Sequence, residues 1–154
     1  MAVSQKSIKA DVWNIFKDLI KTNVTSVTIH GSGGANTKTV NIQNISQSFP
    51  DKLFDSESAY PMITIGSPNF RSNAVTFRSR ELDCTLEFNV FATQSETADK
   101  ITDKIADTIF DNEDDLSSDG IKEVEIDSTD ETNYDRNKIN VHARMLVFRF
   151  KVVL

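Results

Sequence analysis

Apolar residues in the first part of the chain recur three and four positions apart, as they do on one face of an α-helix. The positions on that face are Ile8, Val12, Ile15, Phe16 and Leu19. Charged and amide side chains fill the positions between them, and Ser4 or Ser7 can cap the first turn. The pattern predicts an amphipathic helix that ends near Thr22, where β-branched residues begin.

A second amphipathic helix is predicted after residue 93. Thr93 and Glu96 have the spacing of a capping box. The apolar stripe that follows consists of Ala98, Ile101, Ile105 and Ile109. The acidic sequence DNEDDLSSDG comes directly after this stripe, and we expect it to form a solvated acidic loop over about residues 111–120.

Between the two helices, β-branched and alternating residues predict strands. Residues 24–29 and 39–45 are predicted to pair as a hairpin with a flexible, glycine-rich tip at about residues 30–38. The tip contains His30, Gly33 and Gly34. A phosphate-binding loop needs a helix after its glycines, but a strand pattern follows here, so no nucleotide site is expected.

The regular β part of the domain comes next. Residues 62–66 read as a short strand that is buried on both faces, and residues 74–80 and 81–92 as further strands. Strict alternation along 81–92 is typical of a half-exposed antiparallel strand. The last two strands are predicted at 121–126 and at about 138–154, with the polar sequence DSTDETNYDRN connecting them.

The last strand is apolar in two different phases. Ile139, Val141 and Ala143 belong to one phase, whereas Phe148 and Phe150 belong to the other. Either a β-bulge changes the register near residue 145, or the second half is covered on both faces. We favour a cover from a second subunit, and cover within the same chain is the alternative.

Together these elements predict an α+β fold: a mainly antiparallel sheet with two amphipathic helices packed on it, forming one domain over residues 1–154. The net charge of −6 disfavours general binding to nucleic acid or to anionic membranes. Cys84, the single cysteine, lies in the apolar phase of its strand and is expected to be buried. No apolar stretch approaches the ~20 residues of a membrane span.

Residues suited to catalysis or to metal binding are few. His30 and His142 are the only histidines, no Cys-x-x-Cys pair accompanies them, and no Gly-x-Ser-x-Gly nucleophile motif occurs. The acidic run from Asp111 fails as a calcium loop, because Leu116 and Lys122 stand where glycine and glutamate are needed. We therefore expect no catalytic residue, no cofactor and no metal, and we do not expect an enzyme.

Charged residues are distributed unevenly along the chain. The basic ones are Arg71, Arg78, Arg80, Arg144, Arg149 and Lys151, and the acidic ones are Asp111, Glu113, Asp114 and Asp115. If the strands that carry the basic residues are neighbours, the two groups form oppositely charged regions that can dock head to tail on other copies of the chain. Ordinary salt bridges across a sheet are the alternative.

The order of these elements, together with the strand sequence YPMITIG at residues 60–66, resembles the tail-terminator (tail-completion) proteins of long-tailed bacteriophages. The likeness covers nearly the whole chain in element order. Its sequence motif is an aromatic residue, a proline and an aliphatic strand after the first linker, next to a polar hairpin.

The resemblance implies a ring, typically a hexamer, that caps the finished tail tube, stops its elongation and offers its other face to the head connector. The implied partners are other copies of the chain, the tail tube protein and a head-connector or neck protein, with DNA only passing through the lumen and no membrane. The implied location is the neck end of the virion tail, assembled in the host cytoplasm. The charged residues above, with His30, Gly33 and Gly34, are the candidate interface residues.

Two other functions remain open at this point. The first is a phage head-closure or neck protein with a related layout. The second is a non-viral cytoplasmic α+β domain that binds a ligand or a protein.

Overall fold

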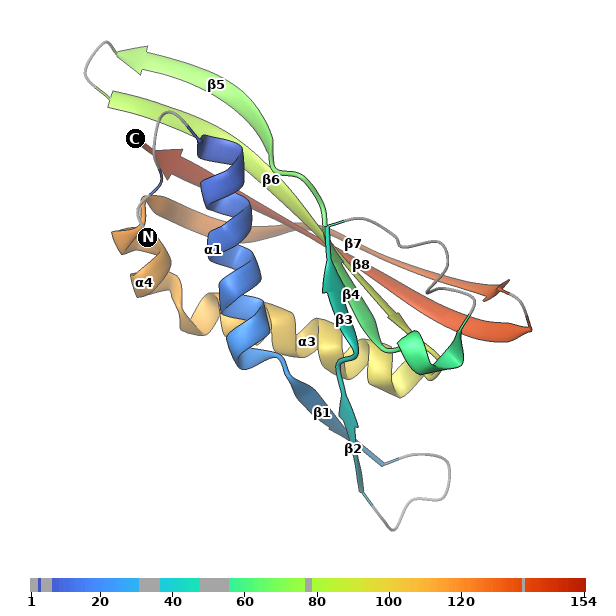
Figure 1. Ribbon diagram of the computed structural model, residues 1–154. Helices are drawn as coiled ribbons and strands as arrows, with labels where there is room; N and C mark the ends of the chain where they lie inside the picture. The colour runs from blue at the N-terminus through green and yellow to red at the C-terminus, as the bar shows by residue number, and fades with distance from the viewer. Residues whose placement is uncertain (1–2, 4–6, 31–36, 48–55, 77–78, 137) are drawn as a thin grey trace.

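The computed structural model describes residues 3, 7–30, 37–47, 56–76, 79–136 and 138–154, with the side chains at 72–80 and 136 left out. It is an α+β fold in which helices α1 (Ile8–Asn23) and α3 (Ser95–Asp111) pack on a six-stranded, mostly antiparallel sheet (Figure 1). The predicted fold class is therefore confirmed.

The main sheet has the strand order β3-β4-β6-β8-β7. These strands span Asn44–Ser46, Met62–Ile65, Ser79–Ala92, Ile139–Val153 and Ile121–Arg136, in that order. The sixth strand, β5 (Asn69–Thr76), pairs with the first half of β6, whereas β4 pairs with its second half. Among the described strands, only β3 and β4 pair in parallel. β1 (Ser26–Ile29) and β2 (Lys38–Asn41) form a separate antiparallel hairpin that projects beyond the helices (Figure 1).

The centre of the core is a cluster of phenylalanine rings that joins α1 to the two central strands. Phe16 lies 5.1 Å from Phe150 and 6.2 Å from Phe88 between ring centroids, and Phe88 lies 5.7 Å from Phe148. All four side chains are at most 1% exposed. The predicted stripes of both helices pack onto this cluster, with Val12 of α1 and Ile101 of α3 fully buried.

The predicted capping box at the start of α3 is wrong. The residue before the helix is Gln94, and no side chain caps the first turn. Ser95 instead accepts a hydrogen bond from Arg144 of β8. The helix thus begins one residue later than the box requires, and Glu96 accepts a hydrogen bond from the backbone N–H of His30.

The predicted acidic loop is largely helical. Residues 113–118 form the short helix α4 (Glu113–Ser118). Leu116 is buried and anchors the helix, while the acidic residues of its first turn lie where the helix dipole favours negative charge. Gly120 then turns the chain into β7 with φ +94°, and a Cβ atom there would lie only 2.7 Å from the Val153 carbonyl oxygen.

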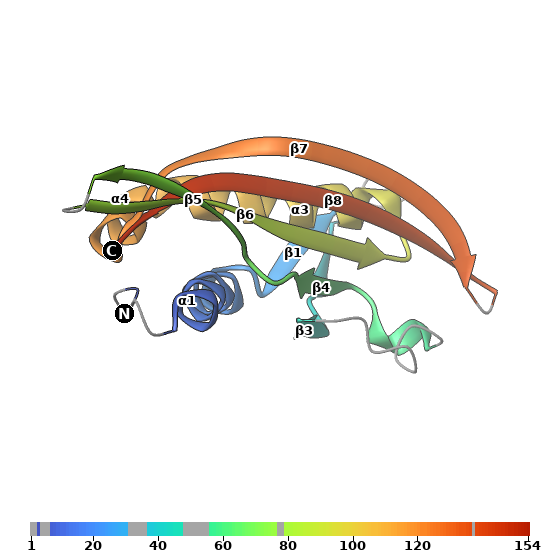
Figure 2. The same cartoon turned by 90° about the horizontal axis from the view of Figure 1, so that it is seen from above.

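The polar connection predicted before the last strand is itself part of a strand. β7 and β8 pair along almost their full lengths, down to Arg136 and Ile139. The long ladder of β8 supplies partners for backbone groups whatever the polarity of the side chains, and this outweighs the low strand propensity of Asp, Asn and Ser. Figure 2 shows the two strands arching along the side of the molecule away from α1.

The two apolar phases of the last strand have a cause within the chain. No bulge occurs near residue 145, because β8 pairs with β6 without interruption from Val153 to His142. The bulges lie in β7 instead, between Lys122 and Glu125 and after Ile126. Val141 packs with Tyr60, Met62 and Phe91 in a small second cluster, whereas the residues from Leu146 onward alternate into the main core on the opposite face. The pattern therefore does not require a second subunit.

Two other strand boundaries differ from expectation. The predicted strand at 39–45 is divided, because the chain leaves the small hairpin at Asn41 and enters the main sheet at Asn44. The predicted break between residues 80 and 81 is absent, since β6 runs continuously through it and β5 begins already at Asn69. Residues 31–36 of the predicted flexible tip lie outside the described residues.

We predict that Phe88→Ala lowers the free energy of unfolding by about 3–5 kcal/mol, because the deleted ring leaves a cavity between Phe16 and Phe148. Phe110→Ala is the matched control: its ring also contacts Phe148, at 5.9 Å, but is 37% exposed. The control should cost clearly less. Urea unfolding followed by circular dichroism measures both, and equal losses would contradict this account of the core.

We also predict that Cys84 does not react with a thiol reagent at pH 8 in the folded protein and reacts fully in denaturant. Burial raises its pKa from 9.0 to about 12. Because the unfolded thiol ionises first, the stability that the neutral thiol provides is present below about pH 9 and is lost as the pH rises toward 12. Rapid labelling under native conditions would show that the strand opens readily.

Candidate functional site: the two margins of the main sheet

The predicted basic residues of β8 lie on opposite faces of the sheet. Arg144 pairs with Val90 on the face that carries the helices, whereas Arg149 pairs with Thr85 on the open face. Lys151, paired with Asp83, also lies on the open face. The neighbouring strands β6 and β8 pair, as expected. Because side chains alternate along β8, however, Arg144 lies on the opposite face from Arg149 and Lys151.

Arg144 is a buried connection between three elements. Its side chain is 7% exposed, and its Nε donates to Asp99 Oδ1 of α3 at 2.7 Å. Its terminal nitrogens donate to Ser95 Oγ at 3.0 Å and to the Ala143 carbonyl at 3.0 Å. Glu131 of β7 adds a longer ion pair at 3.7 Å. Arg144 therefore holds the start of α3 against β8 and is not available to a partner.

Arg149 and Lys151 belong to a ladder of ion pairs on the open face. Arg149 binds Glu125 in a close contact, and Lys151 Nζ lies 3.1 Å from Glu123 and 3.9 Å from Glu81. These hydrogen-bonded carboxylates raise the pKa of both cations. Arg149 and Lys151 therefore form ordinary salt bridges across the sheet, which was the alternative stated for them.

Of the other predicted residues, Arg71 lies near Arg149. It is exposed on β5, opposite Asp83 of β6, and lines one pocket with Asp83 and Arg149. His30 is exposed at the end of β1 with its Nδ1 atom 3.4 Å from Glu96. Arg80 lies in β6, but its side chain is among those not described, and Arg78, Gly33 and Gly34 lie outside the described residues.

The predicted acidic residues are exposed at the corner between α3 and α4. Asp111 ends α3, and Glu113, Asp114 and Asp115 form the first turn of α4. Within the part of the chain that the structure describes, none of the four forms an ion pair. They remain a free acidic surface, as the sequence suggested, although on a helix rather than on a loop.

A longer acidic surface lies along β7, which sequence analysis assigned mostly to a connection. β7 is the last strand on its side of the sheet, and no described strand pairs with its outer edge. It carries two basic residues, Lys122 and Arg136, and six acidic ones: Glu123, Glu125, Asp127, Asp130, Glu131 and Asp135. We call this surface the acidic edge.

An exposed apolar spot interrupts the acidic edge near its bulges. Ile126 is 44% exposed and Phe110 of α3 is 37% exposed, the two large hydrophobic side chains exposed among the described residues. Both adjoin the buried ring of Phe148, Ile126 through strand pairing and Phe110 through ring contact. Side chains of this kind beside an unpaired edge are typical of a surface that meets another protein.

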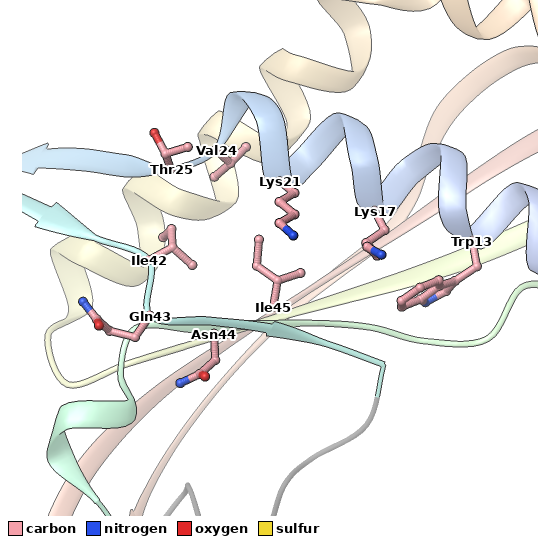
Figure 3. Close-up of a pocket in the computed structure, with 9 residues that line it drawn as sticks. All are labelled: Trp13, Lys17, Lys21, Val24, Thr25, Ile42, Gln43, Asn44 and Ile45. Atoms are coloured by element: carbon pink, nitrogen blue, oxygen red, sulfur yellow. The ribbon is translucent and has the colours of Figure 1, made fainter. Parts of the chain in front are cut away.

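The opposite margin of the sheet carries a basic groove of about 420 Å³ between α1 and β3 (Figure 3). Figure 3 shows the side chains of Lys17 and Lys21 extending from α1 over the groove, with Trp13 at one end. Its apolar lining comes from Val24, Ile42 and Ile45. We call this the Lys17–Lys21 groove.

The groove is held in place by two contacts of Trp13. The indole Nε1 donates to the Ile65 carbonyl at 3.0 Å, which fixes α1 against β4. Lys17 Nζ lies 5.4 Å from the centre of the Trp13 ring, within range of a cation–π interaction. Among the described residues, neither Lys17 nor Lys21 has a carboxylate partner.

Sequence analysis placed these lysines only on the polar face of a helix. Their spacing of four residues does put them on one side of α1. What the sequence did not reveal is that the divided strand at 39–45 crosses beneath them and creates the groove.

Among the described residues, no group of three or more His, Cys, Asp or Glu side chains is placed to hold a metal ion. His142 Nδ1 lies 2.9 Å from Asn133 Oδ1. Cys84 of β6 is not close to it, because it pairs with Phe150 near the other end of β8. No described helix is both long enough and apolar enough to cross a membrane.

Comparison with known proteins gives no family assignment: no protein-family model and no curated protein matches this chain. The two charged margins of the sheet therefore have to be interpreted from their own geometry.

We predict that Arg144→Ala lowers the free energy of unfolding by about 2–4 kcal/mol, because it removes several charge-assisted hydrogen bonds from a buried site. Arg149→Ala is the matched control, the same substitution in the same strand on the open face. It should leave the unfolding midpoint almost unchanged, because its ion pairs are exposed to solvent. Chemical denaturation of both variants makes the comparison, and the opposite ranking would refute the roles assigned to the two arginines.

Proposed function

We propose that this protein is a phage tail terminator: a structural subunit that forms a ring on the end of the tail tube, stops tube elongation and presents its other face to the head connector. The observation that carries the proposal is the polarity of the main sheet. One margin is an acidic strand whose outer edge no described strand pairs, and the opposite margin carries cations without carboxylate partners among the described residues.

Opposite charge at opposite margins favours a head-to-tail contact between copies. In such a contact, one surface of a subunit meets a different surface of the next, and the chain of contacts closes into a ring when the rotation allows. Self-pairing of two acidic edges is disfavoured by like charge. The bulges at Lys122–Glu125 and after Ile126 also protect β7 against unspecific strand pairing.

The same architecture supplies contacts for other components. The β7–β8 hairpin and the β1–β2 hairpin both extend beyond the helices and offer surfaces on different sides of the molecule (Figures 1 and 2). A tail tube protein and a head-connector protein are the partners that the proposal requires. The net charge of −6 suits a ring through which DNA passes without being bound.

We predict that loss of this chain during phage assembly yields tails of uncontrolled, excessive length, and that supplying the protein restores a single length. Electron microscopy of lysates measures the length distribution. Tails of normal length beside heads that leak DNA would replace the terminator function with that of a head-closure protein. No effect on either structure would reject both functions.

A further inference from the structure

The Lys17–Lys21 groove is positively charged and concave, and packing of the core does not account for either property. Its lysines have no carboxylate partner among the described residues, and Ile42 and Ile45 of its apolar lining are only half-buried, whereas Val24 is fully buried in the core. A stable core explains Trp13, whose N–H is satisfied by the Ile65 carbonyl. The stability of the core does not explain why Lys17 and Lys21 lie over the apolar side chains of Ile42 and Ile45.

The acidic edge carries the complementary features on one face. Side chains of β7 that point to the helix side of the sheet are those paired with even-numbered residues of β8, which face the core or its rim. Glu131 and Asp135 belong to this set; Glu131 also forms the 3.7 Å ion pair with Arg144, but its side chain is 74% exposed. Ile126, paired with Phe148, contributes an exposed apolar side chain. The edge thus presents carboxylates and an apolar group on the side of the sheet where α1 lies.

The position of β3 shows where the acidic edge of a second copy could lie. β3 is the last described strand at the margin opposite β7 in the six-stranded path, and its residues Asn44 and Ile45 line the groove. A strand added beside β3 with its faces kept would place its helix-side side chains under α1. There they would meet Lys17 and Lys21.

We propose that the Lys17–Lys21 groove is the docking site for the acidic edge of a second copy of this chain. The β7 strand of one copy lies beside β3 of the next, with Glu131 and Asp135 directed at the lysines and Ile126 toward the apolar lining. This proposal deepens the proposed function, since it names the contact through which the ring would form. It requires only self-association, not a phage tail.

Charge reversal tests the contact directly. The groove variant is Lys17→Glu with Lys21→Glu, and the edge variant is Glu131→Lys with Asp135→Lys. Each variant alone should associate about tenfold or more weakly than the natural chain, because like charges then face each other. An equal mixture of the two, and a chain carrying all four substitutions, should recover association to within about threefold of the natural chain. Native mass spectrometry and sedimentation across a concentration series provide the readout.

Two controls separate this contact from a general effect of charge. Asp130→Lys with Thr132→Lys changes the same stretch of β7 on its open face, and Lys9→Glu changes α1 outside the groove. Both should associate like the natural chain, and circular dichroism should show that every variant is folded.

Two results would overturn the proposal: a natural chain that stays monomeric at the highest attainable concentration, or reversed variants that fail to recover association when mixed. If mixing restores association but loss of the protein leaves tail length unchanged, the contact is supported and the terminator function is rejected. If tail length depends on the protein but mixing does not restore association, the terminator function is supported and this contact is rejected.

Discussion

The pairing of β6 with β8 is the constraint on which the rest of the molecule depends. Twelve consecutive residue pairs join the two strands without a bulge. Because side chains alternate strictly along such a ladder, one face receives Cys84, Phe88, Phe148 and Phe150 together. That face is apolar enough to bind both helices, and the other carries the small second hydrophobic cluster at one end and charged residues at the other. The helices, the ion-pair ladder and the two margins all take their places from this register.

The same register explains why neighbouring cations do different things. Arg144 and Arg149 are five residues apart and therefore lie on opposite faces. Arg144 is drawn into the rim of the core and organises the start of α3, while Arg149 satisfies carboxylates in the open. A basic residue in a strand is evidence for an interface only after its face and its partners are known.

Much of the fold was predictable from periodicity. Both helices, the buried strand at β4 and the alternation along β6 follow from side-chain patterns that are local in sequence. The errors lie where a distant partner decides the structure. Polar residues of β7 became a strand because β8 offers a continuous ladder, and the acidic segment became helical because Leu116 could be buried. The predicted cap of α3, by contrast, failed because the helix begins one residue later than the Thr93–Glu96 box requires, with Gln94 at the N-cap.

The candidate site was harder to predict, for a related reason. Clusters of like charge in the sequence marked Arg144, Arg149 and Lys151, and folding provides all three with partners inside the chain. Among the described cations without a carboxylate partner, Lys17 and Lys21 stand out because they line a groove, although they looked like ordinary residues on the polar face of a helix. What distinguishes them is the crossing of the chain from β2 to β3 beneath them, a long-range feature without a local signal. Interface charge in a strand-rich protein is therefore best sought among cations that the fold leaves without partners and that line a concave surface, as Lys17 and Lys21 do in this chain.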